Sequence, residues 1–163
     1  VIYRVFYALP IDGIHKIHNG LKQGYLTLTM RCNSGKSYSH QIITHLYDTK
    51  ELSQVQNVDP PIIKLGNRGH FSIYPEIWME KIDEGDLYIY NKTNRNSEFR
   101  FKNIDIGEKL FVDCKNEIIN TDKERTYRYD DFNDNYLELI YGANVLALSS
   151  NMKIRFRYRY IFS

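Results

Sequence analysis

Several acidic side chains lie close together near the middle of the chain, and paired carboxylates are the groups that hydrolyse glycosidic bonds. They are Glu76, Glu80, Asp83, Glu84 and Asp86. A glycosidase holds two carboxyl groups about 5–9 Å apart across a cleft. The sequence fixes no such geometry, and Gly85 indicates that the last three residues of the group lie in a turn. We therefore expect no catalytic residues here.

Two other patterns that could support chemistry lack a required residue. The run 131–135 begins like a calcium-binding loop, but Tyr136 stands at the sixth place, where glycine is needed, and Gly142 at the twelfth, where glutamate is needed. His15 and His18 lie close together without a third ligand at metal spacing. The sequence also has no Gly-x-Ser-x-Gly nucleophile turn. We expect no metal, no cofactor and no enzymatic activity.

The single tryptophan is the best candidate for contact with a saccharide. On the surface of a β-sandwich, Trp78 with Tyr74 or Tyr88 could stack against a sugar ring. The alternative is that Trp78 packs in an interface or in the core, because large aromatic side chains are usually mostly buried.

The end of the chain alternates apolar and basic side chains, the pattern of a strand with one buried and one solvated face. The basic positions are Lys153, Arg155, Arg157 and Arg159. A basic groove with aromatic platforms would suit single-stranded nucleic acid, but the aromatic residues here occupy the opposite face. We therefore expect a solvated or subunit-facing strand, and we add Tyr141, in the preceding turn, as a candidate interface residue.

Composition sets the broad class of the protein. The chain has 163 residues, 42% of them hydrophobic and 26% charged, with a net charge of +2. This balance is typical of a globular domain and argues against nucleic acid as the main partner. No apolar run approaches the ~20 residues of a membrane span, so we expect no membrane contact. The chain begins on a strand-like run without a methionine, which suggests a fragment or a processed product rather than a secretory leader.

The two cysteines, Cys32 and Cys114, lie far apart and outside any Cys-x-x-Cys pair. This spacing shows no zinc or redox motif. We expect two buried free thiols, since free cysteine behaves as a small hydrophobic residue. A disulfide between the two cysteines is the alternative that the sequence leaves open.

Short strand-like runs recur between turn-forming residues along the chain. Before residue 48 they cover 1–8, 24–33 and 38–47, with a turn at 10–13 and an ambiguous, loop-like stretch at 14–21. After residue 61 they cover 62–65, 72–81, 86–91, 98–101, 109–114, 117–120, 136–140, 145–148 and 153–161. Many short strands with few helical signals predict an all-β protein, an antiparallel β-sandwich or jelly roll. The polar stretch 48–61, with a weak helical period and a final Pro60-Pro61, predicts a linker.

Six short motifs follow one another in the second part of the chain. They are Gly66 to Gly69, Tyr74 to Ile77, Gly85 to Thr93, Ile106 to Cys114, Leu137 to Asn144 and Lys153 to Arg159. Their order resembles the carboxyl-terminal half of the distal tail protein of long-tailed, non-contractile bacteriophages. The earlier run 24–32 resembles the strand that ends the amino-terminal domain of that family.

The resemblance implies a galectin-like β-sandwich at 62–163, a linker at 48–61, and a β-rich segment at 1–47 that is the remnant of a preceding ring-forming domain. It implies a structural component of the tail tip or baseplate in the virion, expressed in the bacterial host cytoplasm. Such proteins form a ring, usually hexameric, and dock other tail proteins between the tail tube and the host-adsorption apparatus. The alternative is a carbohydrate-binding module that recognises a cell-wall saccharide through Trp78, Tyr74 and Tyr88.

Overall fold

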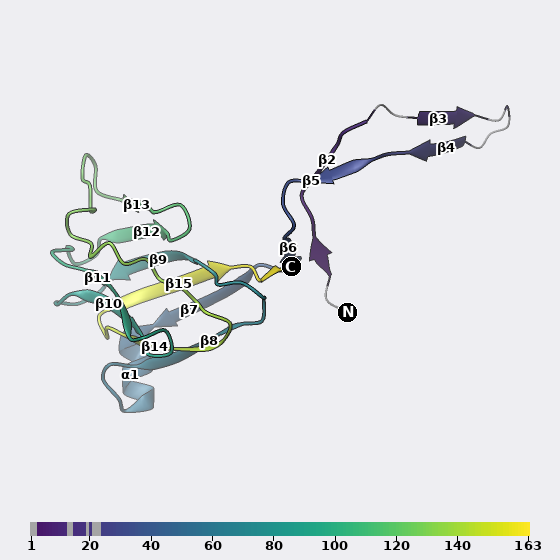
Figure 1. The fold of residues 1–163 in the computed structure, drawn as a ribbon. Coiled ribbons are helices and arrows are strands. Elements are labelled where there is room, and N and C mark those ends of the chain that lie inside the picture. Colours follow the sequence, from purple (N-terminus) through teal and green to yellow (C-terminus); the bar gives the residue numbers. More distant parts are fainter. Residues whose placement is uncertain (1–2, 13–14, 19, 21–23) are drawn as a thin grey trace.

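Two antiparallel β-sheets face each other and form a β-sandwich, as Figure 1 shows. This structure is a computed structural model that describes residues 3–12, 15–18, 20 and 24–163. The first sheet has five strands in the order β13-β12-β9-β15-β7. Their bounds are Ile43–Asp48 (β7), Glu76–Lys81 (β9), Lys109–Asp113 (β12), Ile118–Thr121 (β13) and Met152–Tyr158 (β15). The second sheet has four strands in the order β11-β10-β14-β8, which are Ile62–Asn67 (β8), Leu87–Asn91 (β10), Ser97–Phe101 (β11) and Gly142–Leu148 (β14).

The core lies between the two sheets and is built from one face of each strand. Along β15, buried and exposed residues alternate without exception from Met152 to Tyr158. Both sheets contribute to one hydrophobic cluster, which includes Leu65, Ile89, Phe101 and Leu146 from one sheet and Ile77, Leu110, Ile154 and Phe156 from the other. The predicted all-β sandwich is therefore confirmed, since apolar and polar residues alternate in the sequence just as buried and exposed residues alternate in the structure.

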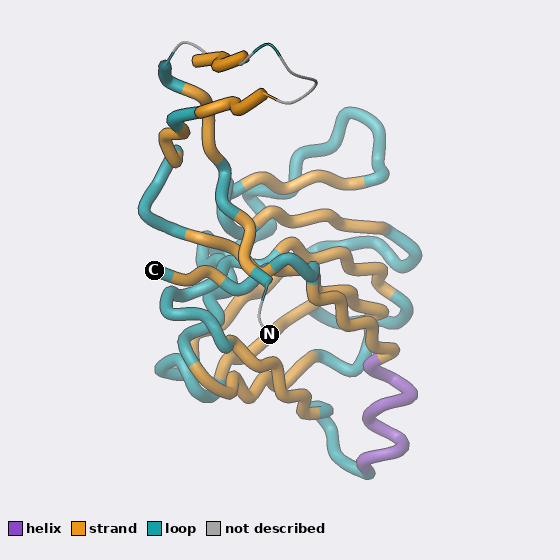
Figure 2. Tube along the Cα trace, turned by 90° about the vertical axis from the view of Figure 1, so that its right-hand side faces the viewer, coloured by secondary structure: helices purple, strands orange, loops and turns teal. Residues whose placement is uncertain are grey.

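A long arm leaves the sandwich at the end opposite to helix α1 (Thr49–Gln56), as Figures 1 and 2 show. The arm consists of two ladders of two strands each: β2 (Ala8–Pro10) pairs with β5 (Met30–Cys32), and β3 (His15–His18) pairs with β4 (Gly24–Thr27). A basal sheet joins the arm to the sandwich. It contains β1 (Arg4–Val5), β6 (Ser37–Ser39) and the carboxyl-terminal strand β16 (Ile161–Phe162) in the order β1-β6-β16.

The arm differs from the expectations in two respects. The stretch 14–21, which we expected to be a loop, contains β3, while residues 1–2, 13–14, 19 and 21–23 of the predicted strand, turn and loop lie outside the described residues. Cys32, which we expected to be buried, is exposed, whereas Cys114 is buried, and both are free thiols. Cys32 is exposed because its strand pairs within the arm and packs on no second layer.

Residues 43–56 differ from the expected division of the chain. Strand β7 forms the edge of the five-stranded sheet beside β15, and the next residues form α1 rather than a linker. The Asp48 side chain accepts hydrogen bonds from the amides of Lys50 and Glu51, which caps the helix. At the other end, the Gln56 amide bonds both the N–H and the carbonyl of Ile62. These contacts fix the segment, so the sandwich begins before residue 62.

The predicted strand at 136–140 is not formed, because asparagine side chains replace the neighbouring strand as bonding partners. Asn91 donates to the Glu138 carbonyl and to the Asn144 side chain. Asn67 donates to the carbonyl of Leu139, and Asn144 bonds both the N–H and the carbonyl of Ile140. Only Leu139 also makes a bridge, to Ile73. Three asparagines from three of the motifs therefore hold one irregular segment across the sandwich.

Gly69 permits the close approach of the carboxyl-terminal strand. An added Cβ at this position would lie 2.5 Å from the carbonyl oxygen and 2.7 Å from the nitrogen of Ile161. The next residue, His70, donates its amide to the same carbonyl at 2.7 Å. Any larger residue at position 69 would therefore displace β16 and with it the basal sheet.

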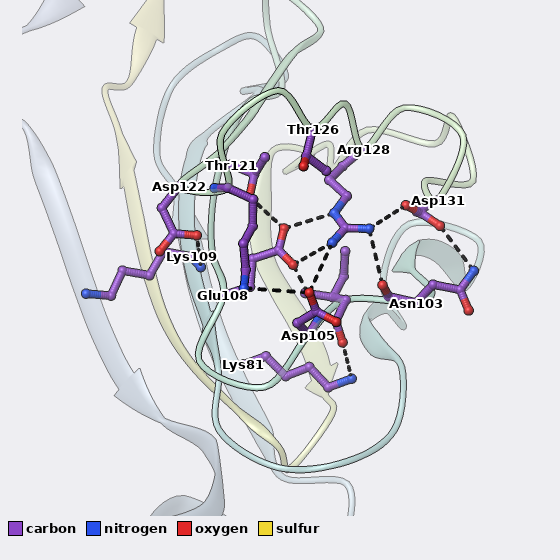
Figure 3. A network of polar contacts seen from close by, with 12 residues as sticks. Lys81, Asn103, Asp105, Glu108, Lys109, Thr121, Asp122, Thr126, Arg128 and Asp131 are labelled. Atoms are coloured by element: carbon purple, nitrogen blue, oxygen red, sulfur yellow. Dashed lines mark hydrogen bonds and ion pairs between the residues drawn. The ribbon is translucent and has the colours of Figure 1, made fainter.

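An ion-pair network, drawn in Figure 3, includes Arg128 and Asp131 and so fixes the long segment between β13 and β14. The carboxylate of Glu108 is fully buried and accepts two hydrogen bonds from the Arg128 guanidinium, at 2.9 and 2.7 Å, and one from Thr121 at 2.6 Å. Arg128, which is 12% exposed, also donates to Asp131 and to the Asn103 carbonyl. Each charge in this pair is satisfied by the other, so removal of one partner would leave a buried charge unpaired.

We expect Arg128→Met to lower the free energy of unfolding by about 3–5 kcal/mol, because it strands the buried Glu108 carboxylate. Urea denaturation followed by circular dichroism measures the loss. The control is Lys50→Met, which removes an exposed ion pair to Asp83 and is expected to change little, since exposed pairs contribute little. Equal effects of the two substitutions would contradict the role assigned to Glu108.

The same network predicts a pH dependence. Burial alone would raise the pKa of Glu108, but the hydrogen bonds from Arg128, Thr121 and the Asp105 amide outweigh it and hold this pKa below its usual value of 4.5. A lowered folded-state pKa stabilises the protein above the unfolded pKa, and this contribution is lost as the pH falls through the folded value. Without Arg128, burial raises this pKa, so the stability difference between wild type and Arg128→Met should shrink as the pH falls and Glu108 becomes protonated, first in the variant and then in the wild type. Urea midpoints measured along a pH series test this.

Candidate functional site

The outer face of the five-stranded sheet carries a row of four side chains that crosses four strands. The antiparallel register places Phe111 of β12 beside Trp78 of β9, Trp78 beside Arg155 of β15, and Arg155 beside Leu46 of β7. We call these four residues the tryptophan row. In each strand the member of the row lies between residues that are more buried, so its side chain points away from the core.

The centre of the tryptophan row is a stack of side chains. The Arg155 guanidinium carbon lies 3.9 Å from the centroid of the Trp78 ring, and the Phe111 ring centroid lies 4.9 Å from that of Trp78 on the other side. A guanidinium over the face of an indole is attracted by the ring quadrupole and keeps its N–H groups free at the edge. Leu46, 73% exposed, continues the row on the far side of Arg155.

Charged rows flank the tryptophan row on both sides. On one side Lys153 lies between Glu80 and Asp48 in the register. On the other, Arg157 forms an ion pair with Glu76, 3.4 Å between Nη1 and Oε2. Arg157 and Glu76 therefore neutralise each other, and Lys153 has a carboxylate residue on each neighbouring strand, whereas Arg155 has no acidic partner among the residues that the structure describes.

A groove of about 850 Å³ adjoins this face where the arm meets the sandwich, and we call it the basal groove. Its cationic lining residues are Lys36, Lys115, Arg157 and Arg159. Arg159 follows the end of β15 and donates to the Tyr7 hydroxyl at 3.2 Å, while the Lys36 ammonium lies 4.6 Å from the Phe71 ring centroid. The three arginines of the predicted series therefore have different partners: Arg155 stacks on Trp78, Arg157 pairs with Glu76, and Arg159 bonds Tyr7 at the base of the arm.

The structure brings some of the candidate residues together and separates others. Trp78 meets Arg155, which the sequence placed in a different candidate group. Tyr88 belongs to the four-stranded sheet and points outward there, next to Tyr90 at 5.2 Å between ring centroids, so it lies on the opposite side of the sandwich from Trp78. Tyr74 precedes β9 and lines the basal groove. Tyr141, 71% exposed, adjoins β14 of the other sheet. The three candidate saccharide contacts therefore do not form one site.

Phe111 and Leu46 are members of the row that the sequence reasoning did not single out. Phe111 alternates with apolar residues and shares its parity with Lys109 and Asp113, which signalled an outward position. Leu46 is an apolar residue on the exposed parity of β7. Their proximity to Trp78 and Arg155 follows from the strand register, which no local pattern in the sequence encodes.

Two of the acidic residues of the middle segment form ion pairs with cations rather than a carboxylate pair. Glu76 binds Arg157, and Asp83 binds Lys50 at 2.7 Å. The hydrogen bond from Lys50 holds the pKa of Asp83 below its usual range. A general acid for glycoside cleavage needs the opposite shift. The surface features on this face are suited to contact: a stacked cation, exposed apolar side chains and a groove.

Three comparisons with known proteins bear on this fold and surface. The model of the family described as "Phage tail C-terminal domain" matches residues 38–158. The chain belongs to this family. It is therefore a structural component of a phage tail, and the matched region runs from the basal sheet to the last residue of β15.

The relatives extend the same result. Over 156 residues the chain is 30% identical to the SPbeta prophage-derived uncharacterized protein YomH of Bacillus subtilis strain 168, covering 96% of this chain and 59% of YomH. The crystal structure of SPP1 Dit (gp 19.1), described as a paradigm of the hub adsorption apparatus in phages that infect Gram-positive bacteria, superposes with a TM-score of 0.64 at 13% identity. That match covers 96% of this chain and 60% of Dit. The resemblance to the carboxyl-terminal half of distal tail proteins is confirmed, and the chain spans only part of each relative.

The single tryptophan allows the stack to be tested directly. We expect Arg155→Ala to move the Trp78 emission to longer wavelength and to increase its quenching by acrylamide, because the substitution uncovers one ring face. The free energy of unfolding should fall by about 0.5–1 kcal/mol, the usual contribution of an exposed cation–π pair. Lys153→Ala, on the same strand and face, is the control and should leave the emission unchanged. An unaltered spectrum in Arg155→Ala would contradict the stacked geometry.

Proposed function

We propose that this chain is a docking module of a phage tail tip, which links the tail tube to host-adsorption proteins. The observation that carries the proposal is the arm. Its apolar side chains are exposed along its length, among them Leu9 at 72% and Tyr25 at 70%, with Phe6, Ile11, Leu26 and Met30 also exposed. Exposed apolar side chains in this number are typical of a protein contact.

The arm cannot bury these side chains by itself. Each of its ladders has two strands, and a two-stranded ribbon has no second layer to cover either face. The sandwich does not cover them either, because the arm extends away from it (Figures 1 and 2). A partner surface is therefore required, and a second copy of the chain supplies one in a homo-oligomer. The relation of residues 1–47 to a ring-forming domain, and a hexameric ring of the full-length protein, belong to this proposal.

The sandwich supports docking rather than catalysis. Its hydrophobic core is closed, and several of its outward carboxylates are engaged by cations or by their own turns, as Glu76 is by Arg157 and Asp113 by the amides of Lys115 and Asn116. A rigid β-sandwich that presents a fixed face and a groove suits the mechanical role of a tail component. Cell-wall saccharide as a partner remains a prediction; of the two tyrosines expected beside Trp78, Tyr88 lies on the other sheet, which leaves the pair of Trp78 with Tyr74.

We expect the chain to form oligomers through the arm, and the double substitution Leu9→Asp with Leu26→Asp to convert them to monomers of 19.4 kDa. Two charges on the exposed apolar arm would have to be desolvated in the contact, which strongly opposes association. Light scattering coupled to size-exclusion chromatography measures the mass. Tyr127→Asp, at an exposed loop of the sandwich, is the matched control and should leave the mass unchanged. A wild-type chain that remains monomeric at millimolar concentration would contradict the role of the arm.

A further inference from the structure

We propose that the tryptophan row and the basal groove together bind an extended, acidic segment of another tail protein, with one carboxylate held by Arg155 and apolar side chains on either side of it. This inference rests on the proposed docking function and specifies its partner and its place on the sandwich. The juxtaposition that carries it is an unpaired guanidinium between outward-facing apolar groups, next to a cationic groove.

The apolar part of the row has the composition of an interface centre. Tryptophan and arginine are the residues most enriched among the few that dominate binding energy. Here the two are pre-organised against each other, since Trp78 and Arg155 are already stacked at 3.9 Å. Phe111 and the exposed Leu46 extend the same row in both directions. A segment that crosses the strands would cover apolar surface on both sides of Arg155.

The hydrogen-bonding capacity of Arg155 defines the group that it takes. A guanidinium has five N–H donors in a planar fork that matches a carboxylate. No hydrogen bond or ion pair occupies these donors in the part of the chain that the structure describes. Arg157, two residues along the same face and therefore about 7 Å away, is in contrast already paired with Glu76. Arg155 is the available position for an incoming carboxylate.

The charge of the adjoining groove favours an acidic segment. The groove and Arg155 together hold five cations against two carboxylates, Glu76 and Asp113, a net charge of +3 at neutral pH. Both carboxylates are occupied, one by Arg157 and the other by its own turn. Lys36, Lys115 and Arg159 have no acidic partner among the described residues. A segment that leaves the row toward the arm therefore enters a surface of opposite charge, which speeds and orients its encounter.

The outward-facing apolar residues select a protein rather than a polyol phosphate. A polyol phosphate would satisfy the cations of the groove, but its backbone has no apolar groups to cover Leu46 and Phe111. An acidic peptide with apolar neighbours satisfies both parts of the surface.

The experiment uses overlapping synthetic peptides that cover the proteins encoded beside this one in the phage genome, titrated against the whole chain. Peptides that contain Asp or Glu between apolar residues should bind, and Arg155→Glu should weaken them by at least about 30-fold, the usual effect of breaking a charge pair in an interface. Replacing the peptide carboxylate by lysine should restore binding to Arg155→Glu. Trp78→Ala and Leu46→Ala should also weaken binding.

Lys153→Gln is the matched control, since Lys153 lies on the same strand and face as Arg155 but outside the tryptophan row; it should retain most of the affinity. Circular dichroism of every variant verifies folding, and Leu46→Ala, at an exposed position, preserves the test should Trp78→Ala fail to fold. Peptide binding that is insensitive to all row variants would overturn the inference while leaving the docking function intact. Binding of poly(glycerol phosphate) that depends on Arg155 but not on Leu46 would overturn it in favour of an anionic polymer. The absence of binding by every peptide would also overturn the inference. The docking function would be overturned only if, in addition, the wild-type chain formed no oligomers through the arm.

Discussion

The register of β15 is the constraint on which the rest of the structure depends. This strand is paired on both sides, with β9 and β7, so its alternation fixes the two faces of the central part of the sheet. A shift by one residue would move Ile154 and Phe156 to solvent and bury Arg155 and Arg157. The hydrophobic core and the tryptophan row are therefore two consequences of one register, and neither can change without the other.

Buried polar groups provide the second level of order, because they fix the segments that the sheets do not. The asparagines of three separate motifs meet around residues 138–140, and the Glu108–Arg128 pair holds the segment before them. Such groups are costly when unpaired and specific when satisfied. These groups account for the Asn, Gly and charged residues in the recognisable motifs of the chain, which also contain core residues such as Leu110 and Phe156.

The strands of the sandwich and the burial parity of β15 could be predicted, because both follow from local periodicity. Three features could not. Helix α1 has an exposed surface and few apolar residues, so its stability comes from the Asp48 cap and the Gln56 bridge to Ile62, which are contacts rather than patterns. The segment 136–140 has the composition of a strand but bonds to side chains. The stack of Trp78 on Arg155 depends on β9 and β15 being neighbours in the sheet. The placement of Trp78 and Tyr88 on different sheets likewise depends on the order of the strands. The site was therefore predicted by residue type, but its assembly was not.

The basal sheet connects the two proposed contact surfaces mechanically. Strand β6 is paired with β1 on one side and with β16 on the other, and β16 is fixed to the sandwich through Gly69 and His70. The chain runs from Arg155 in the tryptophan row through Arg159, which bonds Tyr7 at the base of the arm, to Phe162 in β16. A force on the arm is transmitted to β16 and along the same short stretch of chain to β15, the most constrained strand of the sandwich. A partner bound at the row and a subunit bound at the arm would thus be joined through the basal sheet and the short stretch of chain from β15 to β16, an arrangement that suits the proposed docking role.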